Sequence, residues 1–160
     1  MIVGAKWGPV GTGPGSPRRQ PTGREITEGQ VERVFYGFHE RQLDDKGRVA
    51  LPALYREEFR GHCVLTQGEG RCIDVLPVDD FDAEVERVRS RVRAGDLPIW
   101  RQRSIMHSAI PGQIDKQGRV KVDERLRRYA SLDLSSKVIV AGNDDRLEVW
   151  SVAVYEEEAA

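Results

Sequence analysis

The chain has 160 residues, of which 39% are hydrophobic and 32% charged, and its formal net charge is −1. This length suits one compact domain or two small ones packed together. No segment approaches a run of about 18 apolar residues, and the first residues lack the apolar core of a signal peptide, so we expect a cytoplasmic protein without a membrane partner. The net charge does not indicate nucleic-acid binding, and such a site would have to come from local clustering of positive side chains.

Residues 1–33 are rich in glycine, proline, serine and threonine and show no apolar period. They cannot bury enough apolar surface to offset the entropy lost on ordering, so we expect a disordered extension. An alternative is a mis-called gene start, with translation beginning at Val31 or Val34. Under both interpretations, the folded part begins near Val34.

One segment of the chain occurs twice. QLDDKGRVALPALYR, over residues 42–56, aligns without gaps with QIDKQGRVKVDERLR, over residues 113–127, and the similarity resumes between residues 64–76 and 138–150. Self-similarity at this density indicates two copies of one supersecondary unit.

The first copy predicts strand, turn, strand, helix and two further strands. An extended run over 34–43 leads into an Asp-x-x-Gly-Arg turn, in which the aspartate accepts local N–H bonds and the glycine takes a positive φ. Pro52 suits the first helical position of a helix over 53–60. Strands are expected over 63–67 and 71–76.

Two helices are expected between the copies. Residues 79–94 carry an apolar stripe at helical spacing, with acidic residues in the first turns and arginines in the last, which complements the helix dipole. A second, short helix is predicted over 97–104. The stripe consists of Phe81, Val85, Val88 and Val92.

The second copy repeats the pattern. We expect an extended run over 106–114, a helix over 124–130 with Asp123 as its N-cap, and strands over 137–141 and 145–150. A short acidic helix is predicted at the C-terminus. The expected organisation is an extension (1–33), a first domain (34–81), connecting helices (82–105), a second domain (106–152) and a tail (153–160).

Catalytic and metal-binding patterns do not occur in the sequence. No nucleophile elbow, phosphate-binding loop, dinucleotide fingerprint or histidine-bearing metal motif is present, so we predict a non-enzymatic protein without metal or cofactor. Cys63 and Cys72 suit free thiols in a reducing cytosol. The isolated histidines, His39, His62 and His107, suit packing or surface positions.

Positive side chains gather around the two turns. Each copy has an arginine directly after the turn glycine and another in the following helix. A guanidinium offers a planar fork that suits phosphates and guanine edges. An alternative is that the post-turn arginines form structural salt bridges with the aspartates four residues back, and the two roles are compatible. The residues concerned are Arg48 with Asp44 and Arg56 in the first copy, and Arg119 with Asp115 and Arg127 in the second.

The Asp-x-x-Gly-Arg motif, followed by a short apolar strand, proline and a basic helix, resembles the SpoVT/AbrB-type DNA-binding domain. Two such domains in one chain, with FYGFHERQLDDKGRVALPALYRE and a later IDKQGRV, resemble the MraZ family of bacterial regulators over residues 34–150. The resemblance implies an α+β fold: two tandem β-α-β-β units packed as an intramolecular pseudo-dimer, with an intervening helix.

The resemblance also implies a function. It suggests a nucleoid-associated transcriptional regulator that binds double-stranded DNA at direct repeats in the promoter of the division and cell-wall gene cluster, as an autorepressor and a ring-like homo-oligomer without a small-molecule ligand. The second copy departs from the first, with Asp123 for Pro52 and Gly112 for Arg41, which suggests unequal DNA contact. The implied DNA-binding residues are Arg41, Lys46, Arg48, Arg56, Lys116, Arg119 and Arg127, with Asp44 and Asp115 as motif carboxylates.

Two alternatives stay open. One is an AbrB-like antitoxin that neutralises a protein partner, although the doubled motif and the brief C-terminal tail do not favour it. The other is an oligomeric scaffold without DNA binding. Val34, Phe35 and Phe38 form an apolar strand edge that needs cover, so we expect a homo-oligomer larger than a dimer.

Overall fold

The computed structural model describes residues 34–159, and the expectation for residues 1–33 lies outside this range. Each copy contributes four strands and a helix, and two further helices join the copies. The first copy comprises β1 (Phe38–Gln42), β2 (Arg48–Ala50), a 3₁₀ helix η1 (Ala53–Tyr55), α1 (Arg56–Phe59), β3 (His62–Gln67) and β4 (Ile73–Leu76). The connecting helices are α2 (Val78–Arg93) and α3 (Ile99–Ser108). The second copy comprises β5 (Ile110–Gln113), β6 (Arg119–Lys121), α4 (Glu124–Ala130), β7 (Lys137–Asn143) and β8 (Arg146–Ser151), followed by α5 (Val152–Glu158).

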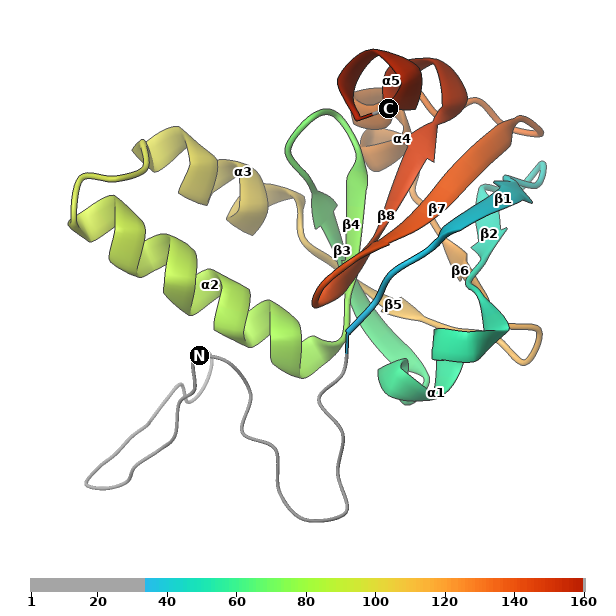
Figure 1. Ribbon diagram of the computed structural model, residues 1–160, viewed down its shortest axis with the longest axis horizontal. Helices are drawn as coiled ribbons and strands as arrows, with labels where there is room; N and C mark the ends of the chain where they lie inside the picture. Colours follow the sequence, from blue (N-terminus) through green and yellow to red (C-terminus); the bar gives the residue numbers. More distant parts are fainter. Residues whose placement is uncertain (1–33, 160) are drawn as a thin grey trace. The chain divides into compact units, whose positions relative to one another are not determined.

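Strands are exchanged between the two copies. The six-stranded sheet has the order β1-β7-β8-β4-β3-β5, so the first strand of each copy pairs with the third strand of the other. The short strands β2 and β6 pair with each other in a separate antiparallel ribbon. Neither copy completes a sheet alone, which confirms the expected α+β pseudo-dimer (Figure 1).

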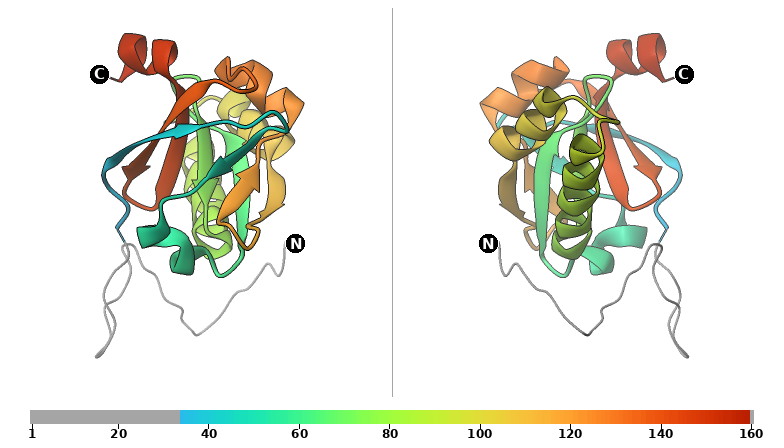
Figure 2. Two further views of the ribbon diagram at one scale, coloured as in Figure 1. Left: turned by 90° about the vertical axis from the view of Figure 1, so that its right-hand side faces the viewer. Right: turned by 90° about the vertical axis from the view of Figure 1, so that its left-hand side faces the viewer.

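The core joins the two copies. Val49 and Val120 face each other at the centre of the β2–β6 ribbon and are fully buried, as are Leu51 and Val122 beside them. Burial of one such side chain stabilises a fold by about 1.5–3 kcal/mol. The ribbon and the α2–α3 hairpin lie on opposite sides of the molecule (Figure 2).

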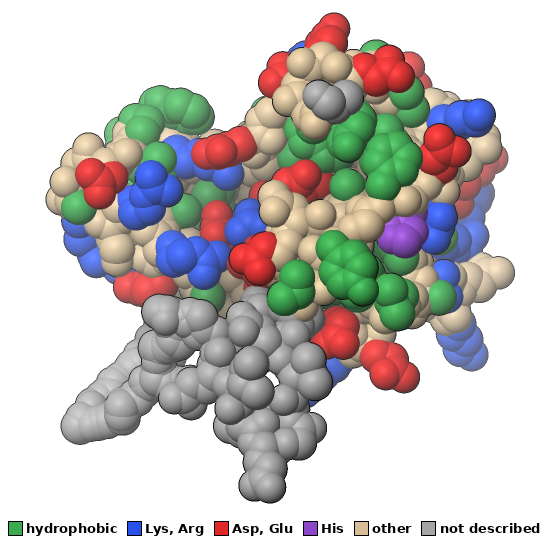
Figure 3. Space-filling model, in the orientation of Figure 1, with side chains coloured by type: hydrophobic (Ala, Val, Ile, Leu, Met, Phe, Trp, Pro, Cys, Tyr) green, Lys and Arg blue, Asp and Glu red, His purple; other side chains and the backbone are tan. Residues whose placement is uncertain are grey.

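The expectation that Phe35 forms part of an exposed edge was wrong. Its ring is 1% exposed and packs against Tyr55 and Phe59, with centroid distances of 4.9 and 5.4 Å. A backbone bridge to Asp144 holds it there. Val34 and Phe38 stay about half exposed, at 46% and 52%. Figure 3 shows hydrophobic side chains gathered on the face that carries β1 and α5.

The extended run expected over 106–114 was also wrong at its start, because α3 continues to Ser108. Hydrogen bonds to β3 fix this helix end: the Ser108 hydroxyl lies 2.8 Å from Thr66 Oγ1 and accepts from the backbone N–H of Gln67 at 2.9 Å. A sequence pattern does not contain these tertiary bonds. The strand is therefore limited to β5.

The helix expected over 53–60 is divided into the 3₁₀ turn η1 and the one-turn helix α1, and the other predicted helices and strands differ at their ends. Pro52 is not the first residue of an α-helix; it precedes the 3₁₀ turn η1, because its ψ of 132° is extended. Asp123 is the N-cap of α4, as predicted, and its side chain accepts from Leu126 N. Helix α2 begins at Val78, so the boundary expected at residue 81 falls inside it. Among the described residues, no helix is both long and apolar enough to cross a bilayer.

Candidate nucleic-acid interface

The first Asp-x-x-Gly-Arg turn is closed by one carboxylate. Asp44 Oδ1 accepts from the backbone N–H of Lys46 at 2.9 Å and of Arg48 at 2.8 Å. The Gly47 N–H donates to the Asp44 carbonyl at 3.1 Å, and Gly47 takes a φ of +81° that favours glycine. The motif aspartate is thus required by the backbone of the turn.

The second turn has the same geometry. Asp115 Oδ1 accepts from the backbone N–H groups of Gln117 and Arg119, both at 2.9 Å. Gly118 takes a φ of +79° and donates to the Asp115 carbonyl at 2.8 Å. The two copies of the motif therefore fold alike although their intervening residues differ.

The post-turn arginines form the expected salt bridges. Arg48 Nε donates to Asp44 Oδ2 at 2.8 Å, and Arg119 Nε donates to Asp115 Oδ2 at 3.0 Å. Arg119 Nη1 also lies 3.7 Å from Asp44 Oδ2, so one carboxylate faces both guanidinium groups. The bond to Arg48 uses Nε only, and within residues 34–159 its two Nη groups engage no carboxylate or carbonyl. The aspartate fixes the side chain while leaving the Nη fork open to a ligand.

Hydrogen bonds to both aspartates hold them ionised. Burial alone would raise the pKa of Asp44, but the backbone N–H groups of Arg48 and Lys46 and the Arg48 guanidinium outweigh it and lower the pKa to about 2. The backbone N–H of Arg119 and its guanidinium likewise lower the pKa of Asp115.

The β2–β6 ribbon presents four side chains outward. Its register pairs Arg48 with Lys121 and Ala50 with Arg119, on either side of the buried central valines. Successive residues of a strand point to opposite faces, so these four side chains share the outer face. Lys121 belongs to the basic residues around the second turn, but only the register between the copies places it and Ala50 beside the two arginines on this face.

The helix arginines point elsewhere. Arg56 Nε donates to the Leu51 carbonyl at 3.0 Å, and its guanidinium occupies the space where a β-carbon of Gly118 would lie. Arg127 Nη1 donates to the Val122 carbonyl at 3.1 Å, and a β-carbon at Gly47 would lie 2.8 Å from it. Each arginine is therefore packed over the turn of the other copy.

The remaining residues of the implied DNA-binding set are dispersed. Lys46 and Lys116 are exposed in the two turns. Arg41 lies on β1 and donates to the Glu40 carbonyl at 2.8 Å. Its counterpart Gly112 has no room for a side chain, since a β-carbon there would lie 2.6 Å from Leu65 Cδ1.

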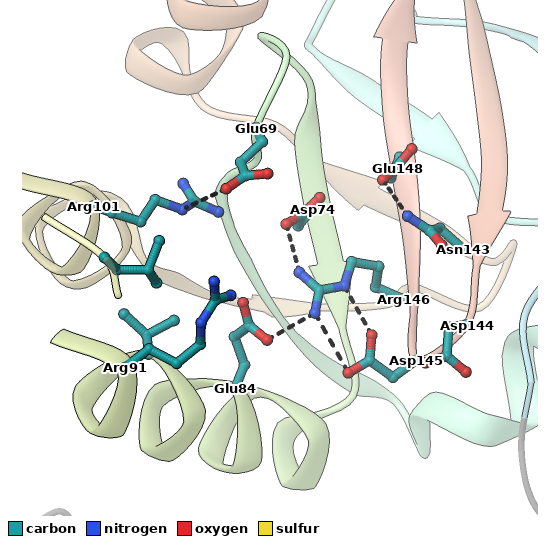
Figure 4. A pocket seen from close by; sticks show the side chains of 12 residues that line it. Glu69, Asp74, Glu84, Arg91, Arg101, Asn143, Asp144, Asp145, Arg146 and Glu148 are labelled. Carbon is teal, nitrogen blue, oxygen red and sulfur yellow. Dashed lines mark hydrogen bonds and ion pairs between the residues drawn. The ribbon is translucent and has the colours of Figure 1, made fainter. Parts of the chain in front are cut away.

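A second charged cluster lies on β8 and was not found from the sequence. Arg146 binds Asp74 on β4, Glu84 on α2 and the adjacent Asp145, each at 2.8 Å, and all four side chains are largely buried. Arg87 adds bonds to Glu84 at 2.6 Å and to Asp145 at 2.9 Å. The cluster lines a pocket of about 300 Å³ (Figure 4) and fastens α2 to the sheet.

One group of side chains near this pocket has the spacing of metal ligands. Ligand atoms of Cys72, Asp74 and Glu148 lie within 4.8 Å of one another. Burial raises the pKa of the Cys72 thiol and raises that of Asp74 to about 6 despite the opposing Arg146 charge. A metal site needs deprotonated ligands, so this environment does not favour one. Cys63 and Cys72 are both buried and unpaired.

Comparison with known proteins identifies the family. The family model described as "MraZ protein, putative antitoxin-like" matches residues 34–93 and 106–159. The chain belongs to the MraZ family. The resemblance inferred from the duplicated motif is thereby confirmed.

Members of the MraZ family in several organisms are named "Transcriptional regulator MraZ". The protein of Salinispora tropica is 37% identical over 123 residues, which are 77% of this chain and 85% of the relative. That of Clavibacter michiganensis subsp. michiganensis is 37% identical over 124 residues, covering 78% and 85%. That of Thermomicrobium roseum is 38% identical over 119 residues, covering 74% and 82%.

The packing of Arg56 over Gly118 predicts a specific coupling. Gly118→Ala should destabilise the fold more than Gly61→Ala, because both glycines have a positive φ of about 80° but no atom lies within 4 Å of a β-carbon at Gly61. The shared backbone strain costs about 1–2 kcal/mol, and the excess measures the clash. Arg56→Ala should remove most of that excess in urea unfolding. An unchanged excess in the Arg56→Ala background would show that the side chain does not occupy this space.

The lowered pKa of Asp44 predicts a pH-dependent stability. The ionised carboxylate stabilises the folded state fully above its ordinary pKa of 3.8, and this contribution is lost as the pH falls toward about 2. Asp44→Asn should therefore melt below the wild type at pH 7, and the difference should shrink between about pH 4 and pH 2. Asp45→Asn, in the same turn, is the control and should melt like the wild type throughout. A difference for Asp44→Asn that stays constant with pH would contradict the assignment.

The buried Arg146 cluster predicts a large loss of stability on truncation. Arg146→Met removes the ion-pair partner of the buried Asp74 and leaves Glu84 and Asp145 with Arg87 alone, which should cost about 3–5 kcal/mol in chemical unfolding. The control is Arg89→Met, which removes an exposed pair with Glu86 and should cost less than about 1 kcal/mol. Equal losses for the two variants would show that the buried cluster contributes no more to the free energy of unfolding than an exposed ion pair does.

Proposed function

We propose that this chain is a sequence-specific DNA-binding transcriptional regulator that inserts the β2–β6 ribbon into the major groove. The observation that carries the proposal is the outer face of the ribbon, where Arg48 and Arg119 are fixed through Nε by motif aspartates. The major groove admits a two-stranded β-ribbon, and arginine reads guanine O6 and N7 through its fork. The name of the relatives, transcriptional regulator, supports the same function.

The exposed turns suit contacts with the DNA backbone. Lys46 and Lys116 lie at the two ends of the ribbon, where phosphates flanking the groove would pass. Phosphate contacts position a protein without reading sequence. We assign to Arg56 and Arg127 the supporting role of holding the turns, rather than a base contact.

We further propose a nucleoid-associated, cytoplasmic homo-oligomer of ring-like form that occupies direct repeats in its own promoter, ahead of the division and cell-wall gene cluster, as an autorepressor. One short ribbon makes few base contacts, and linked ribbons would bind tandem repeats at a high effective concentration. Exposed apolar side chains support self-association: Tyr36, Phe38 and Trp100 are 64%, 52% and 63% exposed.

The decisive test is Arg48→Ala against DNA from upstream of the gene. Loss of a base contact costs about 1–3 kcal/mol per contacting subunit, and the losses multiply along an array, so binding in a mobility-shift or anisotropy assay should nearly vanish. Residual binding should show a shallower dependence on salt. The melting temperature should fall only modestly, because Asp44 keeps its backbone bonds and its contact with Arg119.

Arg103→Ala is the matched control, because this exposed arginine lies on α3, away from the ribbon. It should bind like the wild type. Normal binding by Arg48→Ala would refute the ribbon as the interface. Wild-type protein that binds no upstream DNA but co-purifies with a small protein would favour the antitoxin alternative, and an oligomer with neither activity would favour the scaffold. Light scattering on the same samples would contradict the array if it reports a monomer at micromolar concentration.

A further inference from the structure

The outer face of the ribbon is only approximately two-fold symmetric. The repeat relates Arg48 to Arg119 and Val49 to Val120, and the central valines pair with each other, as a two-fold axis through the ribbon requires. In the same alignment, Ala50 of the first copy and Lys121 of the second occupy equivalent positions. Within the ribbon, the two-fold symmetry of the outward side chains therefore fails only at Ala50 and Lys121.

The two ends of the ribbon consequently differ in chemistry. At one end Arg48 lies opposite Lys121, so two cations share a cross-strand pair. At the other end Arg119 lies opposite Ala50, so one cation is joined by a methyl group. Lys121 is exposed and Ala50 partly exposed, so both are open to a ligand on this face. The turns differ as well, because Asp45 and Lys46 of the first turn align with Lys116 and Gln117 of the second. Contacts from the turns would be to phosphates, which position a protein without reading sequence.

The two ends of the ribbon suit different base edges in the major groove. A lysine amine donates to guanine N7 and O6, whereas an alanine methyl packs on the thymine methyl and offers no hydrogen bond. The two halves of a bound site would thus be read by unlike chemistry, although both flanking arginines are held through Nε by their motif aspartates.

The geometry points to Ala50 and Lys121 as specificity-determining residues that give each subunit a direction on DNA, with guanine preferred opposite Lys121 and thymine preferred opposite Ala50. The inference rests on the proposed DNA binding and deepens it. Each repeat of the site is then non-palindromic. Subunits related by a simple step along the DNA all point the same way, so they require repeats in direct rather than inverted orientation.

The test is selection of binding sites by the full chain from duplexes with a randomised segment. The wild type should select repeats whose halves differ, with guanine at one position and thymine at the symmetry-related one. Ala50→Lys should select guanine at both positions, and Lys121→Ala should select thymine at both, so both variants should give palindromic repeats. Replacing the thymine by guanine in the selected site should weaken wild-type binding about tenfold and not weaken Ala50→Lys.

Matched controls make the same charge changes on the opposite side of the molecule. Ala94→Lys, at the exposed end of α2, adds a lysine, and Arg103→Ala, on α3, removes a cation. Both should select the wild-type sequence. Circular dichroism melting of each variant establishes that it is folded, and Lys121→Ala, at an exposed position, tests the inference even where Ala50→Lys does not fold.

The outcomes separate the two levels of the proposal. Wild-type protein that selects palindromic repeats, or variants that select the wild-type sequence unchanged, would overturn the inference and leave the proposed function standing. Wild-type protein that enriches no sequence would overturn the proposed function itself.

Discussion

The pairing of β2 with β6 is the contact on which the fold depends. Each strand has three residues, which is too few to persist alone, and each is continued by a bond to the turn of the other copy: Leu51 N–H donates to the Gly118 carbonyl at 2.9 Å, and Val122 N–H donates to the Gly47 carbonyl at 2.8 Å. The turn of each copy is thus completed by the strand of its partner copy. The exchange of β1 and β5 in the larger sheet repeats this dependence, so neither copy has a core of its own.

Because each copy packs against the turn of the other, arginines that look equivalent in the sequence point in different directions. All four follow the turn glycine or lie in the next helix, but Arg48 and Arg119 project from the ribbon while Arg56 and Arg127 cross to the opposite turn. A motif specifies which residue types occur at which spacing. The direction of a long side chain depends on what packs beside it, and here the neighbour comes from the other half of the chain. Clustering of positive charge in the sequence therefore does not distinguish arginines that project outward from arginines that pack over a turn.

The sequence predicted the elements better than their surroundings. The repeat, the turns and the Asp123 cap depend on local chemistry, and local chemistry is what a sequence pattern contains. Three features lay beyond it, because each is decided by a residue distant in the chain: the end of α3 at Ser108, bound to Thr66; the burial of Phe35 against Phe59; and the Arg146 cluster. In the candidate site, the pairing of Ala50 with Arg119 depends likewise on the register between the copies.

Duplication within one chain has a consequence that a symmetric dimer lacks. In a two-fold homodimer, a residue at one end of the central ribbon is necessarily present at the other, so both ends offer the same chemistry. Here the two strands are encoded separately and can diverge, provided that the groups closing the turns are kept. The aspartates, the glycines and the central valines are kept in both copies, and the outward pair Ala50 and Lys121 is not. The groups that close the two turns and fill the centre of the ribbon are thus symmetric, and on the ribbon itself the copies differ only at an outward pair that is open to a ligand. A difference at such a pair can distinguish the two ends of the ribbon without disturbing the bonds that hold the strands together.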